Sequence, residues 1–554
     1  MVRVLSLARA LLLSFAVLCA AAAAQAKDDL IVGMTQYPTT FNPMIGSTLA
    51  RTLVINAVMR PLAAFDADWK QVCLLCTEVP TLDNGRVVIE DLPDGKKGMA
   101  VHFTLRQNAR WADGEKVTPD DIVFAWQIGK HPQSGVAAAD YFNHITRIDV
   151  ADEHNFTMHI DRVVWNYNSY APAPMPAHIE RKIFEADPAQ YHNRSKFETD
   201  TTNPGLYFGP YRISAVTPGV SITLVPNPYW YGEKPYFKRI VFKIVENTAA
   251  LEANLLSGSI DYILGELGLS LDQALAFEKR NRDRFDYIYK DSLIYEHIDL
   301  NLDNKLLQDK RVRQALLYAL DRQTLVQTLF EGKQPVADGF VPPLDPNYSP
   351  DVPKYPYDPK KAAALLDEAG FKLQNGVRVN AAGEKLSLEL VTTAGNRVRE
   401  LVQQVLQSQW KQIGVEIRLK ALPPRVFSDN LDHRDFSAMA MYAWVSGPDT
   451  PPRPTLHSQE IPSAANNWSG QNYPAFRNAA MDKVLDAFDV ELDAAKRKTL
   501  AAQMQRIYDE ELPVLPLYFR ADPFILPKWL KGVVPTGQSD GTTLWIEQWR
   551  DTRN

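Results

Sequence analysis

The chain has 554 residues, with 60 Lys and Arg against 66 Asp and Glu, and a formal net charge of −6 at pH 7. This balance lacks the basic excess that nucleic-acid binding requires, so nucleic acid is not an expected partner. Three cysteines in a chain of this length exclude a small disulfide scaffold, and 45% hydrophobic residues exclude a disordered chain. The length predicts roughly three to four structural units.

The N-terminus has the organisation of an export signal. Arg3 and Arg9 form a basic region, and an apolar stretch follows at Ala10–Leu18. Ala24-Gln25-Ala26 then offers the small residues that a signal peptidase needs. We predict cleavage after residue 26, so that the mature chain begins at Lys27; a buried N-terminal helix is the alternative. No later stretch is long and apolar enough to predict a membrane-spanning helix.

The three cysteines fall into two groups. Cys19 follows Leu18, whereas a lipoprotein signal has a small residue before its cysteine, so we expect a soluble exported protein that is not a lipoprotein. Cys73 and Cys76 form a C-x-x-C pair, which can close as a local disulfide in an oxidising compartment. Free thiols and a redox or metal role are the alternatives.

The first structured unit, 27–64, opens with a predicted strand at Asp29–Met34 and continues to a helix over 48–59. It is too short to bury a core by itself, so its partner strands must come from later in the chain.

The segment from Asp66 to about Thr201 is predicted to contain strands and hairpins with inserted helices. Residues 101–106 alternate between apolar and polar, as a strand does. Thr118, Pro119 and two following acids are typical of a helix start, and that helix is predicted to run to Ile128.

From Gly205 to Tyr289 the pattern returns to sheet, and after about Leu293 helices and strands alternate. That alternation predicts βαβ units and a mostly parallel sheet. In 205–289 we predict strands at 221–225, 239–244 and 261–263, and a helix at 248–256 that ends at Gly258. Further on we predict helices at 311–320, 359–369, 397–413 and 494–510, strands at 386–391 and 415–419, and an exposed hairpin at 372–385.

Seven segments follow one another in an order that is known from a protein family. The first is Phe103-Thr104-Leu105-Arg106-x4-Trp111-Ala112-Asp113-Gly114-x3-Thr118-Pro119-x-Asp121. The others are Gly209–Arg212, Asn227–Pro235, Leu256–Asp261, Arg311–Arg322, Leu365–Phe371 and Gln409–Val415. In these segments the chain resembles the bacterial extracellular solute-binding proteins of family 5, which supply peptide and nickel ABC importers.

The resemblance implies an α/β fold of the periplasmic-binding-protein type (class II, cluster C), with two lobes joined by a hinge and an extra inserted lobe. Lobe I would comprise 27–65, 202–291 and 518–554, lobe II 66–201, and lobe III 292–517. Lobes I and III would close around a peptide or peptide-like solute, and the closed form would dock to ABC permease subunits in the inner membrane. The resemblance also implies a monomer that is not an enzyme and needs no cofactor.

The resemblance places a ligand-binding tryptophan at Trp444, with Tyr442 beside it. In peptide-binding relatives an aspartate three residues after this tryptophan receives the α-ammonium group of the ligand, because an unpaired buried cation is costly. Here that position is Gly447, so we expect Asp449 to take the role; the alternatives are a ligand with no ammonium group at this place, and an aspartate that serves as an N-cap or in a turn. An arginine found three residues before the tryptophan in oligopeptide binders is Met441 here.

Tyr37, Phe41 and Asn42 are further candidates for ligand binding. Tyr37 comes just after the first predicted strand, where a sheet edge could offer main-chain groups to an extended ligand. Phe41 and Asn42 follow it closely in the chain.

Four more candidates come from the later α/β region. Asn396 and Arg397 lie where a strand leads into a helix N-terminus, which suits an anionic or polar group. Trp468 and Asn472 are expected to line the cleft. A solvent-exposed helix residue is the alternative for Arg397, and loop packing is the alternative for the last two.

Motifs of common enzymes do not occur in the sequence. The 10 histidines form neither H-E-x-x-H nor an i, i+4 pair, and there is no G-x-S-x-G or G-x-x-x-x-G-K-[ST] segment. We therefore predict no catalytic or metal-binding residues, although an exported hydrolase with paired carboxylates stays open. A second alternative is the same scaffold binding an opine, a glycoside, a nickel complex or haem.

Overall fold

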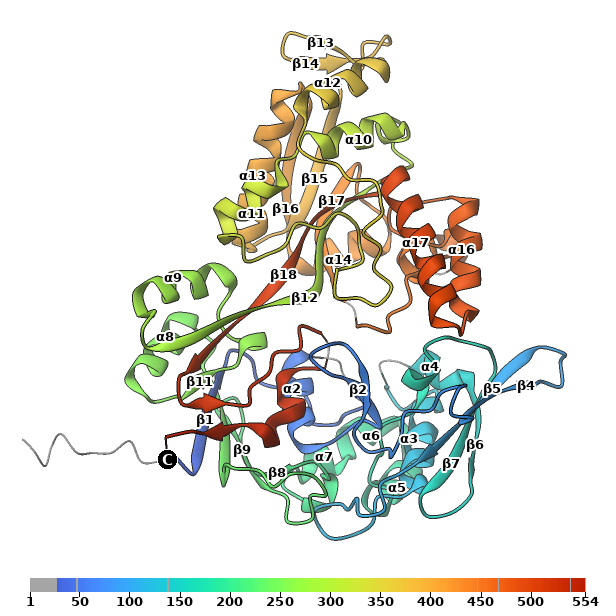
Figure 1. Ribbon diagram of the computed structural model, residues 1–554, viewed down its shortest axis with the longest axis vertical. Helices are drawn as coiled ribbons and strands as arrows, with labels where there is room; N and C mark the ends of the chain where they lie inside the picture. Colours follow the sequence, from blue (N-terminus) through green and yellow to red (C-terminus); the bar gives the residue numbers. More distant parts are fainter. Residues whose placement is uncertain are drawn as a thin grey trace, which may run out of the picture.

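The computed structural model describes residues 27–45, 48–136, 139–445, 447–466, 468–538 and 540–553. The predicted export signal, including Cys19, lies outside these ranges. One mixed sheet of ten strands runs through the molecule, in the order β16-β15-β17-β12-β18-β11-β1-β10-β9-β8 (Figure 1). A second sheet has the order β4-β5-β7-β6.

Strands β12 and β18 connect the two ends of the large sheet. They are long, Phe285–Leu300 and Val514–Pro527, and they pair antiparallel. The ladder is interrupted between the pairs Asp291↔Ala521 and Tyr295↔Phe519, so that three residues of β12 lie opposite one residue of β18. We call 27–291 and 520–553 the lower part and 292–519 the upper part. The lobe limits predicted from the sequence remain a prediction.

The opening strand β1 obtains its partners from distant segments of the lower part. It pairs parallel with β10 on one side and with β11 on the other. The prediction that its partners come from later in the chain is confirmed. The bounds are Asp29–Met34 for β1, Tyr211–Thr217 for β8, Ser221–Pro226 for β9, Arg239–Ile244 for β10 and Tyr262–Ile263 for β11.

The expectation of a mostly parallel sheet in the upper part is wrong. Strand β15 pairs parallel with β16 and β17, but β12 is antiparallel to β17 and to β18. The reason is topological, because β12 enters the upper part from below and β18 returns from it. The bounds are Ser387–Thr393 for β15, Glu416–Leu422 for β16 and Met439–Val445 for β17.

The segment 66–201 forms the small sheet and its helices, and it shares one hydrophobic core with the lower half of the large sheet. Trp111 is fully buried there and its indole N–H lies 3.3 Å from Asp121. Thr118 begins helix α3, and its backbone N–H donates to the same carboxylate at 2.9 Å. The bounds are Val87–Asp91 for β4, Lys97–Thr104 for β5, Ile145–Val150 for β6, Asn155–Ile160 for β7, Pro119–Lys130 for α3, Ala139–His144 for α4 and Ala177–Ala186 for α5.

Three short helices are α6 (Tyr191–Arg194), α7 (Lys196–Thr199) and α15 (Arg453–Leu456). The longer remaining helices cover the large sheet or stand beside it. In the lower part these are α2 (Leu49–Val58), α8 (Thr248–Ser257) and α9 (Leu271–Asn281). In the upper part these are α10 (Lys310–Tyr318), α11 (Arg322–Phe330), α12 (Pro359–Glu368), α13 (Arg397–Gln412), α14 (Pro424–Asp432), α16 (Ala479–Val490) and α17 (Ala494–Glu511), with the hairpin β13–β14 over Lys372–Val379. Within the described ranges, no helix combines the length and hydropathy needed to cross a membrane.

Gly537 lies against the interruption between β12 and β18. Its carbonyl accepts the backbone N–H of Leu293 at 2.9 Å, its φ is +72°, and a Cβ there would overlap the carbonyl oxygen of Asp291. We expect Gly537→Ala to lower the free energy of unfolding by about 3 kcal/mol, because a tight backbone contact must open. Urea denaturation measures this change.

Gly219 provides the control. Its φ is +70°, but a Cβ there would meet no atom within 4 Å. Gly219→Ala should therefore cost only the strain of a left-handed alanine, about 1 kcal/mol. Equal losses in the two variants would contradict the predicted close contact at the strand crossing.

Candidate functional site

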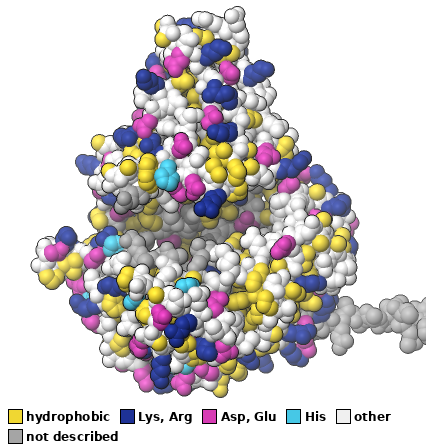
Figure 2. All heavy atoms as spheres, turned by 180° about the vertical axis from the view of Figure 1, so that it is seen from behind, with side chains coloured by type: hydrophobic (Ala, Val, Ile, Leu, Met, Phe, Trp, Pro, Cys, Tyr) yellow, Lys and Arg dark blue, Asp and Glu magenta, His cyan; other side chains and the backbone are white. Residues whose placement is uncertain are grey.

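Three cavities lie along the boundary between the lower and upper parts. The aromatic cavity, lined by Tyr295, Phe340, Trp444 and Tyr508 among others, has a volume of about 380 Å³. The polar cavity measures about 1060 Å³ and is lined by residues that include Asp94, Arg162, Arg453 and Asp489. The lateral cavity measures about 490 Å³ and is lined by residues that include Trp69, Asp449 and Lys498. Figure 2 shows the surface hollowed at this level, between the two parts.

One wall of the aromatic cavity comes from β12 and β17. Because Tyr295 pairs with Trp444 in the ladder, and side chains two residues apart share a face, the rings of Tyr295, His297 and Trp444 line up. The His297 ring lies 4.9 Å from that of Tyr295 and 6.4 Å from that of Trp444, with interplanar angles of 15° and 11°. This wall presents flat aromatic surfaces to whatever enters the cavity.

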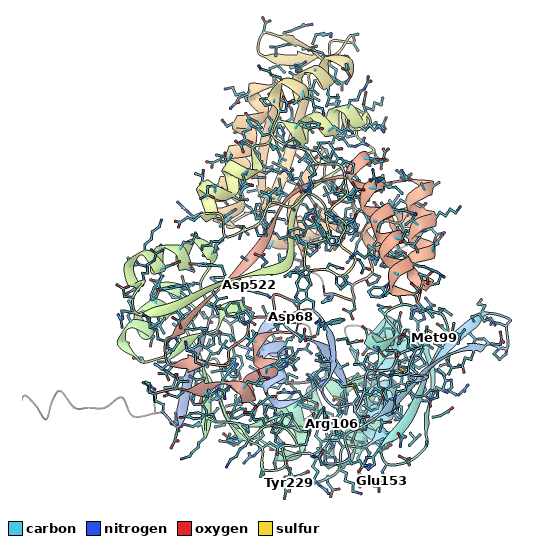
Figure 3. The ribbon with its side chains drawn as sticks, viewed as in Figure 1. Asp68, Met99, Arg106, Glu153, Tyr229 and Asp522 are labelled. Atoms are coloured by element: carbon cyan, nitrogen blue, oxygen red, sulfur yellow. A yellow bond between two sulfur atoms is a disulfide. The ribbon has the colours of Figure 1, made fainter. Side chains whose placement is uncertain are left out.

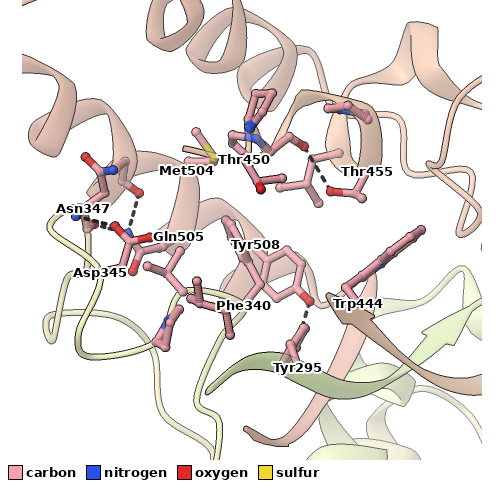
Figure 4. Close-up of a pocket in the computed structure, with 18 of the residues that line it drawn as sticks. Tyr295, Phe340, Asp345, Asn347, Trp444, Thr450, Thr455, Met504, Gln505 and Tyr508 are labelled. Carbon is pink, nitrogen blue, oxygen red and sulfur yellow. Dashed lines mark hydrogen bonds between the residues drawn. The ribbon is translucent and has the colours of Figure 1, made fainter. Parts of the chain in front are cut away.

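The opposite wall comes from α17 and from the loop that contains Phe340 (Figure 4). The ring of Phe340 lies 4.8 Å from that of Tyr508, whose hydroxyl lies 3.1 Å from the hydroxyl of Tyr295. Met504 lines the cavity one turn earlier on α17. Two walls from different elements therefore meet through one pair of tyrosine hydroxyls.

His297 and Asp299 are buried polar residues in the first wall. Nδ1 of His297 lies 2.9 Å from the carbonyl oxygen of Tyr295, which can only accept, so this nitrogen carries a hydrogen. Nε2 lies 3.3 Å from Asp299 but has no hydrogen-bond partner among the described residues. The other oxygen of Asp299 accepts the hydroxyl of Tyr442 at 2.5 Å. Nε2 is itself buried beside the Asp299 carboxylate, so His297 contributes the surface of its ring to the cavity wall.

The charges around the aromatic cavity are all acidic. Asp299 and Asp345 line it, and burial raises the pKa of Asp345. Among the described lining residues there is no Lys or Arg. The cavity therefore suits an apolar, aromatic or hydrogen-bonding group better than a carboxylate, whose burial would need a cationic partner.

Asp509 lies behind the second wall, beside Tyr508. Its side chain is fully buried and both carboxylate oxygens lack a hydrogen-bond partner among the described residues. Burial, together with the charge of Asp338, raises its pKa to about 8, although Arg322 acts in the opposite direction. The carboxyl group is therefore protonated at neutral pH.

Glu296 anchors the opposite face of β12. Burial alone would raise its pKa, but the charges and hydrogen bonds of Arg520 and Arg399 outweigh burial, and the pKa is lowered. Arg399, in the first turn of α13, donates to Glu296 at 3.1 Å, and Arg520 of β18 donates at 2.9 Å. Two residues further along β18, burial raises the pKa of Asp522 to about 7 (Figure 3). Charged groups are thus concentrated where the strands cross between the parts.

Trp444 lines the aromatic cavity, whereas Tyr442 and Asp449 occupy other places. Tyr442 is buried beneath the wall, where its hydroxyl donates to Asp299. Asp449 lines the lateral cavity, and its carboxylate accepts the hydroxyl of Ser169 in the lower part. The backbone carbonyl of Asp449 accepts the side-chain amide of Asn166 at 3.2 Å. Its role as a ligand anchor remains a prediction.

Tyr37, Phe41 and Asn42 pack in the lower part. The rings of Tyr37 and Phe41 are 6.0 Å apart, and Asn42 is fully buried and donates to Ser195 at 3.2 Å. The premise that β1 offers a sheet edge near Tyr37 is wrong, because β10 and β11 occupy both of its edges. None of the three lines one of the cavities described above.

The four candidates from the later α/β region also lie outside these cavities. Asn396 caps α13 by accepting the N–H of Arg399 at 3.1 Å, and Arg397 is exposed. The Trp468 ring lies 4.9 Å from that of His433. Asn472 is fully buried, and its amide donates to the carbonyl oxygens of two neighbouring loop residues. Ligand contact by these residues remains a prediction.

Several cavity residues escaped the sequence analysis. Tyr295, His297 and Asp299 alternate along β12, and this period of two was the signal that could have found them. Tyr508 is one of many apolar positions on an amphipathic helix, so it had no comparable signal. Trp165, which lines all three cavities, lies in a segment that has no motif.

Cys73 and Cys76 are joined by a disulfide, with their Cα atoms 5.1 Å apart. The bond lies in the lower part, and neither cysteine lines the cavities described above. In the part of the chain that the structure describes, no group of three or more His, Cys, Asp and Glu side chains could hold a metal ion.

Comparison with known proteins decides the family. The family model for bacterial extracellular solute-binding proteins, family 5, matches residues 93–462. The chain belongs to this family. Like the solved oligopeptide-binding relatives, it has the α/β fold of periplasmic binding proteins, and the family is one of solute-binding proteins.

Oligopeptide-binding proteins are among its relatives. The oligopeptide-binding protein AppA of Bacillus subtilis is 27% identical over 526 residues, which cover 92% of this chain and 89% of that protein. The oligopeptide-binding protein of Thermus thermophilus, solved with a pentapeptide, is 30% identical with a TM-score of 0.71, and 95% and 97% of the two chains are covered. The structure of the Bacillus AppA with a nonapeptide is 25% identical in sequence, with a TM-score of 0.70. The match covers 95% of this chain and 99% of that chain.

Asp509 should make stability depend on pH. Because the folded chain holds this proton up to about pH 8, whereas an unfolded carboxyl releases it near pH 4, the free energy of unfolding should fall as pH rises between these values. Between pH 5 and pH 8 we expect the wild type to lose roughly 3 kcal/mol relative to Asp509→Asn, which has no proton to release.

Urea denaturation at several pH values tests this slope. Asp351, whose side chain is 95% exposed, gives the control variant Asp351→Asn, which should keep the wild-type slope. A slope that is the same in Asp509→Asn and wild type would show that the buried carboxyl does not retain its proton.

Proposed function

We propose that the protein is the periplasmic solute-binding component of an ABC importer. The mature chain would begin at Lys27, capture a peptide or peptide-like solute between its lower and upper parts, and deliver it as a monomer to permease subunits. The observation that carries this proposal is the aromatic cavity, which the upper part lines together with Trp165 of the lower part, beside the strands β12 and β18 that connect the two parts in the large sheet. Closure about these strands would remove the ligand from water.

The oligopeptide-binding relatives support a peptide as the solute. The aromatic walls of the cavity would hold apolar or aromatic side chains of the peptide. A ligand that binds only the closed arrangement would shift the population of molecules toward that arrangement. The size of the shift would be set by the difference between the ligand's affinities for the closed and open arrangements.

A second candidate is a neutral solute that is not a peptide, such as a glycoside. The observation that favours it is the absence of Lys and Arg from the described lining of the aromatic cavity, because a peptide brings a carboxylate terminus that needs a partner. Under the first proposal that terminus must lie outside this cavity.

Native mass spectrometry distinguishes the two candidates. The full chain, with its own first 26 residues, is expressed in a bacterial periplasm, and native and denatured spectra are compared. We expect a polypeptide mass that begins at Lys27, together with added masses that vanish on denaturation and fragment as peptides. Added masses that fragment as sugars or other compounds would favour the second candidate, and a chain that keeps residues 1–26 or carries lipid would contradict the proposed export.

Trp444 and Trp468 give a matched pair of variants for the site. We expect Trp444→Ala to weaken ligand binding by about 2 kcal/mol, as for a central aromatic contact, because the ring forms a wall of the cavity. Trp468→Ala should leave affinity unchanged, because that ring contacts the His433 ring outside the cavity. Isothermal titration with the ligand identified above measures both, and circular dichroism checks folding. A larger loss in Trp468→Ala would move the site to that loop.

A further inference from the structure

Trp165 carries a contact that crosses the boundary between the two parts. A hydrophobic core under α16 and α17 includes Leu485, Phe488 and Tyr508, and among the described residues packed against it Trp165 alone comes from the lower part. Its ring lies 5.6 Å from the Phe488 ring, and the guanidinium of Arg497 lies 5.1 Å from the Trp165 ring centroid. Its backbone N–H donates to the carbonyl of Asp489 at 3.2 Å.

The residues on either side of Trp165 contact both parts. The preceding residue, Val164, donates its backbone N–H to the sulfur of Met99 at 3.3 Å, and Met99 is fully buried on β5 (Figure 3). Asn166 and Ser169, which follow, both contact Asp449 of the upper part. We call Trp165–Ser169 the bridge segment, because it links the segment inserted at 66–201 directly to the upper part.

Trp165 also lies where the three cavities adjoin, since it lines each of them. On one side is the aromatic cavity of about 380 Å³, and on another is the polar cavity of about 1060 Å³. The ring therefore stands between the smaller cavity and a space nearly three times as large. A ligand that fills the aromatic cavity meets this indole as its boundary.

We propose that Trp165 is a specificity-determining residue of the ligand site, which limits how far a bound ligand extends from the aromatic cavity and docks the inserted segment when the two parts close. The inference rests on the proposed function. A longer ligand must displace the ring from Phe488 and Arg497 and lose those contacts. A shorter ligand leaves the bridge segment in place, so its binding and the closed arrangement favour each other.

A peptide series tests the limit on length. Isothermal titration compares tri-, penta- and nonapeptides that share their first three residues, Ala-Phe-Ala, and are extended with alanine. For the wild type we expect the tripeptide to bind most tightly. In Trp165→Ala the affinities of the longer peptides should rise relative to that of the tripeptide by roughly tenfold, about 1.4 kcal/mol. The reason is that the aromatic cavity and the polar cavity merge when the indole is removed. Trp165→Phe, which keeps an aromatic ring, should retain most of the wild-type preference.

Trp529 provides the matched control. It is half-buried in the lower part, and the guanidinium of Arg553 lies 4.2 Å from the centroid of its ring. It lines none of the three cavities described above. Trp529→Ala should keep the wild-type order of affinities. The inference is overturned if Trp165→Ala changes all three affinities by the same factor, or if the wild type binds the nonapeptide as tightly as the tripeptide.

Solution scattering without ligand separates this inference from the proposed function. We expect Trp165→Ala to have a larger radius of gyration than wild type and Trp529→Ala, because the bridge segment no longer holds the parts together. If no peptide binds but the scattering changes as expected, peptide binding is wrong and the docking role stands. If no peptide binds and Trp165→Ala scatters like the control, the inference fails as well.

Discussion

The antiparallel pairing of β12 with β18 is the constraint on which the rest of the structure depends. These two strands alone carry the large sheet from the lower part to the upper part, and their ladder is interrupted opposite Arg520. A second register shift follows between Glu296 and His297, so the ladder is irregular over the whole crossing and rotation between the parts need break few hydrogen bonds there. Glu296, held by Arg399 and Arg520, ties the crossing to α13 and restricts the directions in which it can bend.

The same strand that forms the crossing also forms the wall of the aromatic cavity. Glu296 faces one side of β12, while Tyr295 and His297 face the other, because side chains alternate along a strand. Any movement of β12 where it passes between the two parts therefore also moves the wall of the aromatic cavity, which begins one or two residues away on the same strand. Across the cavity, Trp165 comes from the inserted segment, so three separate regions of the chain enclose one small volume. The chemistry inside is aromatic and acidic, which selects by shape and hydrogen bonding.

Much of the local structure could be predicted from the sequence, whereas most of the candidate site could not. Asp29–Met34 and Arg239–Ile244 are strands with the predicted limits, and the predicted helix at 494–510 is observed with one further residue. Such elements depend on periodicity and on capping residues, which are local. Asn42 and Asn472 are polar residues in loops, and from sequence they cannot be told from ligand contacts, yet both are buried and hydrogen-bonded within the fold.

The sequence by itself determined many of the helices and strands, the family and the incompleteness of the opening unit, because these follow from neighbouring residues and from motifs in a fixed order. Only the tertiary structure decided which strands cross between the parts and which side chains share a cavity. Tyr295, Trp444, Tyr508 and Trp165 lie far apart in the chain, and they meet because β12 pairs with β17, α17 packs beside them and the inserted segment reaches across. Contacts of this kind arise from long-range packing, for which a local pattern has no signal.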